Sequence, residues 1–289
     1  MIATQSPFID LSTHGGNNVT LQCIANCSTA GGYVGNEALI VGPCTDFSIA
    51  LDLTVSQRSD MINLTTSSYF TLAYISLTNA WQTLALGSSI GWSLSSTVDL
   101  RMRSDNGLIN TPPVATCISY ISIPVGITQT IQIPVIDADN DFIRCRFANG
   151  SSECFNTCPP GSLPSGTSLS SSCTLTITGS LAGNYYLVAI QVEDFMTNAS
   201  VIPMSSVPLQ FLVYVALVQN TTNSSLWSLT ITWQPTATQV GTQVFCAVAS
   251  DSASVQSDQY CVTFSVGLTS VPLCPGATVT TTEAFKIEF

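Results

Sequence analysis

Apolar residues along this chain either alternate with polar ones or come in short runs, and the spacing typical of amphipathic helices is nearly absent. The runs are rich in Val, Ile, Thr, Tyr and Phe, and Gly, Pro, Asn and Ser separate them. The clearest runs span residues 131–136, 173–178, 185–192, 229–233 and 261–266. Alternation that is broken by turn residues at short intervals is typical of antiparallel sandwiches. The pattern therefore predicts an all-β chain of tandem antiparallel Ig-like β-sandwiches.

Two breaks in this pattern divide the chain into three expected units. Residues 110–113 read Asn-Thr-Pro-Pro, and a Pro-Pro pair cannot join a central strand ladder. Residues 220–225 carry two glycosylation sequons in a row, which indicates an exposed loop. We therefore expect domains at 1–111, 112–217 and 218–289. The last has about 70 residues against about 100 for a seven-strand Ig sandwich, so we expect it to lack a strand or more.

Charge and composition exclude several classes of function. The chain has 289 residues, with 17 Asp and Glu against 6 Lys and Arg, and a net charge of −11. Because six scattered cations cannot neutralise a phosphate backbone, we expect no nucleic-acid partner. The single histidine, His14, argues against histidine-based catalysis. A secreted hydrolase is therefore the weakest interpretation, and we expect the protein not to be an enzyme.

The apolar runs are too short for a membrane-spanning helix, which needs about 20 residues, so no membrane span is expected. The longest of them, residues 211–218, suits a buried strand. Residues 1–12 contain neither the basic segment nor the apolar segment of a secretory signal peptide. The numbering is therefore expected to be that of a mature or trimmed chain.

Cysteine usage indicates an oxidising compartment. Eleven cysteines are many for a cytosolic chain of this length, and their spacing does not form paired zinc knuckles. We therefore expect disulfides and a secreted, extracellular protein. Cys246 and Cys261 flank an expected hairpin and are predicted to pair with each other.

The other cysteines leave alternatives open. Four in the middle unit are predicted to form two bridges in one of three connectivities: Cys145, Cys154, Cys158 and Cys173. Five remain, namely Cys23, Cys27, Cys44, Cys117 and Cys274. Because five is odd, one cysteine is either free or bonded to another chain. Cys117 and Cys274 are the candidates, since they lie near the edges of units.

Potential glycosylation sites agree with secretion. Seven N-x-[ST] sequons begin at Asn18, Asn26, Asn63, Asn149, Asn198, Asn220 and Asn223. Only 8% of the residues are charged, so hydroxyls, amides and glycans would have to supply much of the solubility. Calcium and N-linked glycans are the only non-protein groups that the sequence suggests.

A wider set of motifs runs through the middle and third units. The middle unit contains Asn-Thr-Pro-Pro at 110–113, Pro-Val-Ile-Asp-Ala-Asp-Asn-Asp at 134–141 and Val-Pro-Leu-Gln-Phe-Leu at 207–212. The third contains Trp-Gln-Pro at 233–235 and Gln-Ser-Asp-Gln-Tyr-Cys at 256–261. This pattern resembles a class of uncharacterised secreted multidomain β-sandwich glycoproteins of small aquatic invertebrates, over most of residues 85–267. The resemblance implies the fold and secretion, and it implies no activity. Members of that class have extra strands before the Trp-x-Pro segment, which this chain lacks.

Three carboxylates follow a predicted strand at alternate positions: Asp137, Asp139 and Asp141. Such spacing can direct oxygen ligands at Ca²⁺ from a loop, and Glu193 and Asp194 are further candidate ligands. The run resembles the acidic inter-domain calcium motif of cadherins, while the EF-hand pattern does not fit. The alternative is a solvated acidic turn without a metal.

Residues 277–289 form an amphipathic strand pattern. Phe285, Ile287 and Phe289 share one face and polar residues share the other. This segment is either the last strand of the third unit or a strand donated to a neighbouring molecule. Near the N-terminus, Phe8, Ile9 and Leu11 form the other candidate donor segment.

Strand donation would complete an unfinished sandwich in the next copy, which resembles the donor-strand assembly of pilins. A donor and an acceptor at opposite ends of a molecule give a contact that does not close on itself. The leading functional hypothesis is therefore a structural subunit of an extracellular filament or matrix, whose partners are copies of itself joined head to tail. The alternative is an adhesion module of a larger cell-surface or matrix protein, with or without calcium.

Overall fold

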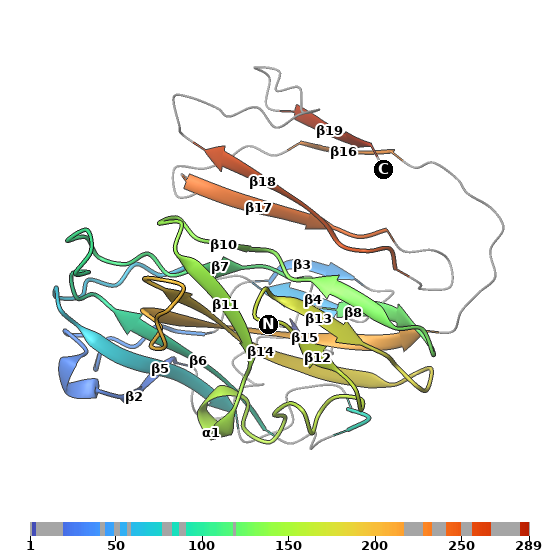
Figure 1. Cartoon of the computed structure of the whole chain (residues 1–289), viewed down its shortest axis with the longest axis horizontal. Coiled ribbons are helices and arrows are strands. Elements are labelled where there is room, and N and C mark those ends of the chain that lie inside the picture. Colours follow the sequence, from blue (N-terminus) through green and yellow to red (C-terminus); the bar gives the residue numbers. More distant parts are fainter. Residues whose placement is uncertain are drawn as a thin grey trace.

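The computed structural model describes residues 2–3, 20–40, 44–48, 53–56, 59–76, 83–86, 91–117, 120–216, 228–232, 241–249, 256–266 and 284–288. Strands dominate this part of the chain (Figure 1), together with one short α-helix, α1 (Gly150–Glu153), and one 3-10 turn, η2 (Cys27–Thr29). The all-β prediction is confirmed. The division into tandem Ig-like domains stays a prediction.

The described residues between 112 and 216 form a two-sheet sandwich. One sheet contains β8 (Tyr120–Pro124), β11 (Phe142–Phe147), β14 (Tyr185–Phe195) and β15 (Ser205–Ala216). The facing sheet contains β9 (Gln129–Gln132), β12 (Ser168–Leu169) and β13 (Thr174–Ile177), and β7 (Val114–Ala115) pairs with β10 (Val135–Ile136) nearby. All of these ladders are antiparallel except β8 with β15, which is parallel.

The main hydrophobic core lies between these two sheets. Ile133, Leu175 and Ile177 on one side pack with Val188 and Val213 on the other, and all five are at most 1% exposed. On β13 the buried residues Leu175 and Ile177 alternate with half-buried ones, because successive side chains of a strand point to opposite faces. This packing explains the period-2 pattern of the middle unit.

Strand β14 departs from that simple alternation, because its residues from 186 to 195 are all buried. Its second face packs under two smaller clusters. Leu187 contacts Leu84 and Leu212, and Ala189 packs with Ala148 and with a disulfide-bonded cysteine of the α1 region. The polar residues Gln191, Glu193 and Asp194 of β14 are therefore also buried.

The large sheet continues into the first predicted unit. Its strand order is β11-β14-β15-β6-β5-β2, where β2 (Gln22–Ala25), β5 (Tyr69–Ser76) and β6 (Trp92–Asp99) lie before the Pro-Pro pair. A single register pair, Ser206 with Thr97, joins β15 to β6. The sheet thus crosses the boundary that the sequence predicts at 111.

The first unit has its own small core around Tyr33 and Phe70, whose ring centroids lie 5.3 Å apart. Gly31 enters this core with a φ of +60°, and a Cβ there would lie 2.0 Å from the hydroxyl oxygen of Ser68. Only glycine satisfies both conditions. A separate sheet pairs β1 (Ile2–Ala3) and β3 (Cys44–Ser48) with the central strand β4 (Leu53–Ser56).

The third unit contains two separate two-stranded ladders (Figure 1). One pairs β16 (Ser228–Thr232) with β19 (Ala284–Glu288), and the other pairs β17 (Gly241–Ala247) with β18 (Tyr260–Val266). No ladder joins the two pairs within the described residues. The backbone N–H of Ser122 on β8 donates to Oε1 of Gln256 at 2.6 Å, which ties this unit to the middle sandwich.

Candidate functional site

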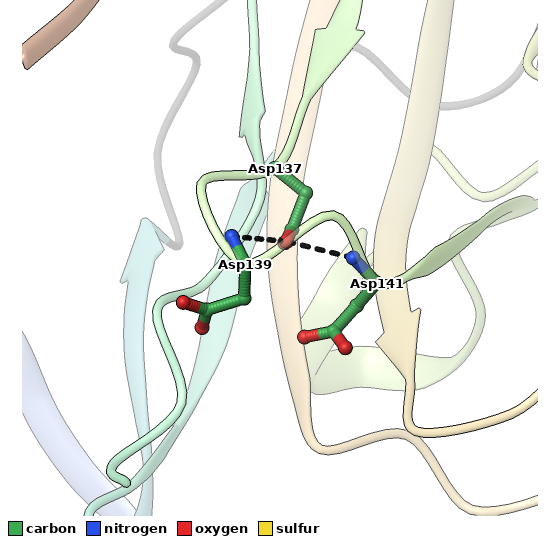
Figure 2. Close-up of side chains that lie close together, drawn as sticks. All are labelled: Asp137, Asp139 and Asp141. Atoms are coloured by element: carbon green, nitrogen blue, oxygen red, sulfur yellow. Dashed lines mark hydrogen bonds between the residues drawn. The ribbon is translucent and has the colours of Figure 1, made fainter. Parts of the chain in front are cut away.

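The acidic loop after β10 folds around its own first carboxylate. Oδ1 of Asp137 accepts the backbone N–H groups of Asp139 at 2.9 Å and Asp141 at 3.0 Å (Figure 2). Asn140 adopts a left-handed conformation with a φ of 60°, which asparagine tolerates better than most residues. One ligand atom from each of the three aspartates lies within 4.8 Å of the others. The alternate spacing therefore gathers these three carboxylates at one place.

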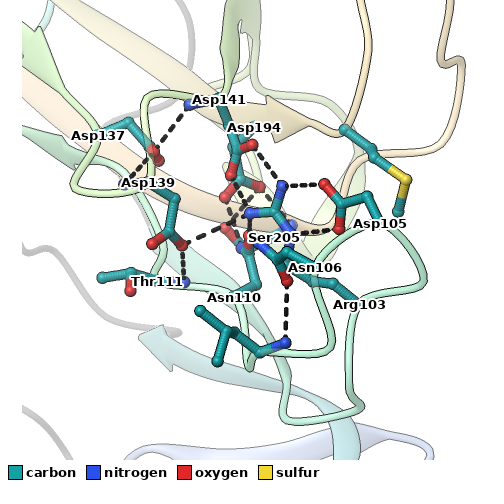
Figure 3. A network of polar contacts seen from close by, with 12 residues as sticks. Arg103, Asp105, Asn106, Asn110, Thr111, Asp137, Asp139, Asp141, Asp194 and Ser205 are labelled. Carbon is teal, nitrogen blue, oxygen red and sulfur yellow. Dashed lines mark hydrogen bonds and ion pairs between the residues drawn. The ribbon is translucent and has the colours of Figure 1, made fainter.

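Arg103 brings a positive charge into this group from the first unit (Figure 3). Its guanidinium donates to both oxygens of Asp141, at 2.5 and 2.7 Å, and to both oxygens of Asp105, at 2.8 and 3.0 Å. A nitrogen of Arg103 also lies 3.6 Å from Asp139. The side chains of Arg103 and Asp141 are each only 6% exposed, so this is a buried ion pair. Paired two-oxygen contacts of this kind are the strong form of carboxylate binding by arginine.

Asp194, the fourth predicted calcium ligand, lies at the end of β14 and is fully buried. Its Oδ2 accepts the side-chain amide of Asn110 at 2.6 Å, and its Oδ1 accepts the backbone N–H and the hydroxyl of Ser205 at 2.6 and 2.8 Å. Burial raises the pKa of Asp194, while these hydrogen bonds oppose the increase. Asp194 is not part of the group of three and acts as an acceptor that organises two backbone segments.

These residues fit a calcium ion only in part. Oδ2 of Asp137 is buried and has no hydrogen-bond partner among the described residues, which leaves one oxygen for a cation. Burial raises the pKa of Asp137, and the negative charges of Asp141 and Asp194 add to the increase. Both oxygens of Asp141 are already bonded to Arg103, however, and Arg103 would repel a nearby metal ion.

A second group of paired charges joins β11, β14 and α1, and its arginine side chain is 41% exposed. Arg146 donates to both oxygens of Glu153, each at 2.8 Å, and to Glu193 at 2.9 Å. Burial raises the pKa of Glu193, and the charge of Arg146 opposes the increase. Glu193, the other further candidate for a calcium ligand, is therefore bound to an arginine and is not part of the group of three aspartates.

The sequence predicted the acidic residues but not their partners. Arg103, Asn110 and Ser205 come from segments that no spacing rule connects with the loop at 137–141. The composition contained one usable signal. The chain has only six Lys and Arg residues against 17 Asp and Glu, and an arginine that becomes buried must pair with a carboxylate.

Four disulfides are present in the described residues. The predicted bond between Cys246 and Cys261 is confirmed. Of the three connectivities open for the middle unit, the structure has Cys145 with Cys173 and Cys154 with Cys158. In the first unit, Cys23 bonds to Cys27.

Cys117 is a free, half-buried cysteine, as one of the two sequence alternatives proposed. Burial raises the pKa of its thiol to about 12. The side chain of Cys44 and the whole of Cys274 lie outside the described residues.

Four of the seven sequon asparagines can be placed. Asn26, Asn63, Asn149 and Asn198 are all exposed. The other three, Asn18, Asn220 and Asn223, lie outside the described residues.

The predicted assembly segment is paired within its own chain. In the antiparallel register, Phe285 of β19 pairs with Ile231 of β16, and Ile287 pairs with Leu229. Phe289 lies outside the described residues, as do Phe8, Ile9 and Leu11.

Four disulfides are compatible with an extracellular protein. Within the described part of the chain, no helix combines the length and hydropathy that crossing a bilayer requires. No protein-family model and no curated protein matches the sequence. Among solved structures, a Bacteroides fragilis protein described as an alpha-galactosidase is 14% identical, and the match covers 37% of this chain and 19% of that protein with a TM-score of 0.27. At this TM-score the similarity supports no conclusion about fold or activity.

Proposed function

We propose that the protein is a structural subunit of an extracellular glycoprotein filament or matrix, joined to its copies by β-strand pairing. One observation carries the proposal: the third unit consists, in its described residues, of two separate two-stranded ladders. An isolated two-stranded ladder is marginally stable in water, and its outer edges are open to further strands. The ladder of β16 and β19 joins segments that lie far apart in the sequence, so a short turn does not hold it together.

Exchange of β19 between molecules would use the pairing already present. The same five register pairs can form with β16 of a neighbouring copy, because the contact surfaces are identical. When each molecule gives its β19 to one neighbour and receives β19 from another, the contacts do not close on themselves and generate a polymer, whereas a reciprocal exchange stops at a dimer. The disulfides and the exposed sequons support an extracellular setting for that polymer.

A pair of introduced cysteines can report whether β19 leaves its own chain. Thr232 and Ala284 are register partners at one end of the ladder, so the double variant Thr232→Cys/Ala284→Cys places two thiols opposite each other. We expect the secreted variant to form a series of disulfide-linked oligomers on a non-reducing gel. The single variant Ala284→Cys is the matched control, because one added thiol supports at most a dimer. Disulfide-closed monomers in the double variant would contradict the proposal.

An adhesion module is the second candidate, and exposed apolar side chains at one end of the molecule favour it. Met102, Val201 and Ile202 lie on loops there and Phe142 begins β11, and these four side chains are 70%, 86%, 77% and 50% exposed, in that order. Arg144 donates to the carbonyl oxygens of Asn198 and Ser200 and thereby fixes the segment of the loop that directly precedes Val201 and Ile202. Apolar side chains on a fixed loop are typical of contact surfaces.

The double variant Val201→Ser/Ile202→Ser tests adhesion. If this end binds a cell or matrix surface, the variant should lose that binding while its thermal unfolding stays unchanged. Met61→Ser is the control, because Met61 is 95% exposed but belongs to the first unit. Equal binding by the wild type, the double variant and Met61→Ser would exclude this candidate.

A further inference from the structure

One sequon lies inside a small disulfide ring. Cys23 and Cys27 are four residues apart and bonded to each other, and their Cα atoms are 5.7 Å apart. The sequon of Asn26 continues through Cys27 to Ser28, so its middle residue is one half of the bond. Asn26 is exposed, and access of solvent therefore does not limit its modification.

The backbone around Asn26 is held from several sides. Asn26 has a left-handed conformation, with a φ of 53° and a ψ of 37°, and the following residues form the 3-10 turn η2. The backbone N–H and the hydroxyl of Thr29 donate to the carbonyl oxygen of Asn26 at 2.9 and 2.7 Å. Ala30, which follows directly, is 2% exposed and packs with the core of the first unit. The sequon is thus part of a closed, anchored turn.

N-glycosylation needs a different arrangement of these three residues. The side-chain nitrogen of asparagine attacks C1 of a lipid-linked oligosaccharide diphosphate. A C–N bond forms, the C1–O bond to the diphosphate breaks, and the nitrogen loses a proton to the transferase. The transferase must enclose the asparagine amide and the hydroxyl two residues later at the same time. A chain segment that is open on both sides can enter such a cleft, whereas a ring closed through the middle residue cannot.

Closure of the ring is expected to come first. The two thiols lose two electrons and two protons to a disulfide-bearing oxidant, as in other secreted proteins. The loop between them is very short, so the two sulfurs meet often as soon as both are in the oxidising compartment.

We propose that the Cys23–Cys27 bond blocks glycosylation of Asn26, so that the secreted chain carries this bond and an unmodified Asn26. Asn63, Asn149 and Asn198 are exposed and have no disulfide-bonded residue within their sequons, so they remain available. This inference rests on the extracellular glycoprotein function proposed above.

Peptide mass mapping of the secreted full chain tests the inference, with glycan occupancy measured at each sequon under non-reducing conditions. Cys23→Ser removes the bond and leaves the sequon intact, and Cys27→Ala removes the bond and leaves the sequon Asn-Ala-Ser. We expect Asn26 to be mostly bare in the wild type and its occupancy to rise several-fold in both variants. Cys117→Ser is the control for the loss of a cysteine as such, and it should leave Asn26 bare. If the variants are not secreted, a pulse of dithiothreitol on wild-type cells delays ring closure and should raise the occupancy in the same way.

Two results would overturn the inference alone. One is a wild-type chain in which most molecules carry both the Cys23–Cys27 bond and a glycan on Asn26. The other is an Asn26 that stays bare in both variants and after the pulse while Asn63 and Asn198 are glycosylated. If every sequon is bare in every chain, the glycoprotein part of the proposed function fails together with the inference.

Discussion

Arg103 sets the chemistry of the acidic loop at the level of single residues. Its guanidinium lies against Asp105, Asp139 and Asp141, where the sequence suggested a calcium ion. This internal cation offsets part of the negative charge of the loop without a bound metal, and it connects the segment after β6 with the loop after β10. Removing one member of a buried charge group is costly, because its partners remain buried and unpaired.

The variant Arg103→Gln should therefore lower the free energy of unfolding by about 3–5 kcal/mol. We also expect Ca²⁺ to raise its thermal unfolding temperature more than that of the wild type, because the carboxylates are then free. Arg101→Gln is the matched control: its ion pair with Asp99 involves an arginine side chain that is 56% exposed, so the loss should be about 0–1 kcal/mol. Equal losses in the two variants, measured by urea unfolding, would contradict the assignment of Arg103.

Cys117 should be unreactive in the folded protein. Because burial raises the pKa of its thiol to about 12, almost no thiolate exists at pH 8. The folded state therefore holds this proton more tightly than the unfolded state, whose thiol pKa is about 8.5, and the stability from this group falls as the pH rises between these values. Alkylation of the peptide that contains Cys117 should be slow at pH 8 and rapid after denaturation. Equal rates in the two states, by mass spectrometry, would show that the thiol is accessible.

At the scale of the strands, buried polar side chains help to join the first and middle units. Gln191 on β14 is 1% exposed; it donates to the carbonyl oxygen of Ser95 at 3.2 Å and accepts the hydroxyl of Ser206 at 2.9 Å. Gln210 on β15 donates to the carbonyl oxygens of Ser93 and Glu153 at 2.6 and 2.9 Å. The backbones of β6 and β15 share only one register pair, and the two side-chain amides add further hydrogen bonds between these parts of the sheet.

Gln191→Leu should weaken this joint. It keeps the side-chain volume but leaves the carbonyl of Ser95 and the hydroxyl of Ser206 unpaired, at a cost of about 1–3 kcal/mol for each group. Hydrogen exchange of β5 and β6 should accelerate more than that of β14. Gln22→Leu, on the exposed edge strand β2, should change stability by no more than about 0.5 kcal/mol. A Gln191→Leu protein as stable as the wild type would show that the amide does not hold the joint.

Across the whole molecule, the four disulfides differ in what they connect. The bond between Cys145 on β11 and Cys173, just before β13, joins the two sheets of the middle sandwich across 28 residues. The bond between Cys154 and Cys158 closes a loop of only 4 residues. A cross-link restricts the unfolded chain more strongly when it closes a longer loop.

Replacing Cys145 and Cys173 by alanine should therefore destabilise the protein by about 3.6 kcal/mol, against about 1.9 kcal/mol for the same change at Cys154 and Cys158. Urea unfolding of the two double variants measures the difference. If the short loop costs more than the long one, local packing around α1 contributes more than chain entropy.

The sequence by itself determined the all-β class, strands within its five clearest apolar runs and the bond between Cys246 and Cys261. These features depend on alternation and on short-range pairing, which a linear pattern carries directly. It also placed Asp137, Asp139 and Asp141 together, because they share one loop.

Only the tertiary structure decided that Arg103 pairs with the aspartates of the acidic loop and that both faces of β14 are buried. It also decided that the large sheet crosses residue 111 and that β19 pairs with β16. Each of these depends on contacts between segments distant in the sequence. Alternation and turn residues define a strand and its faces, but several strands offer similar edges and faces, and packing in three dimensions selects among them.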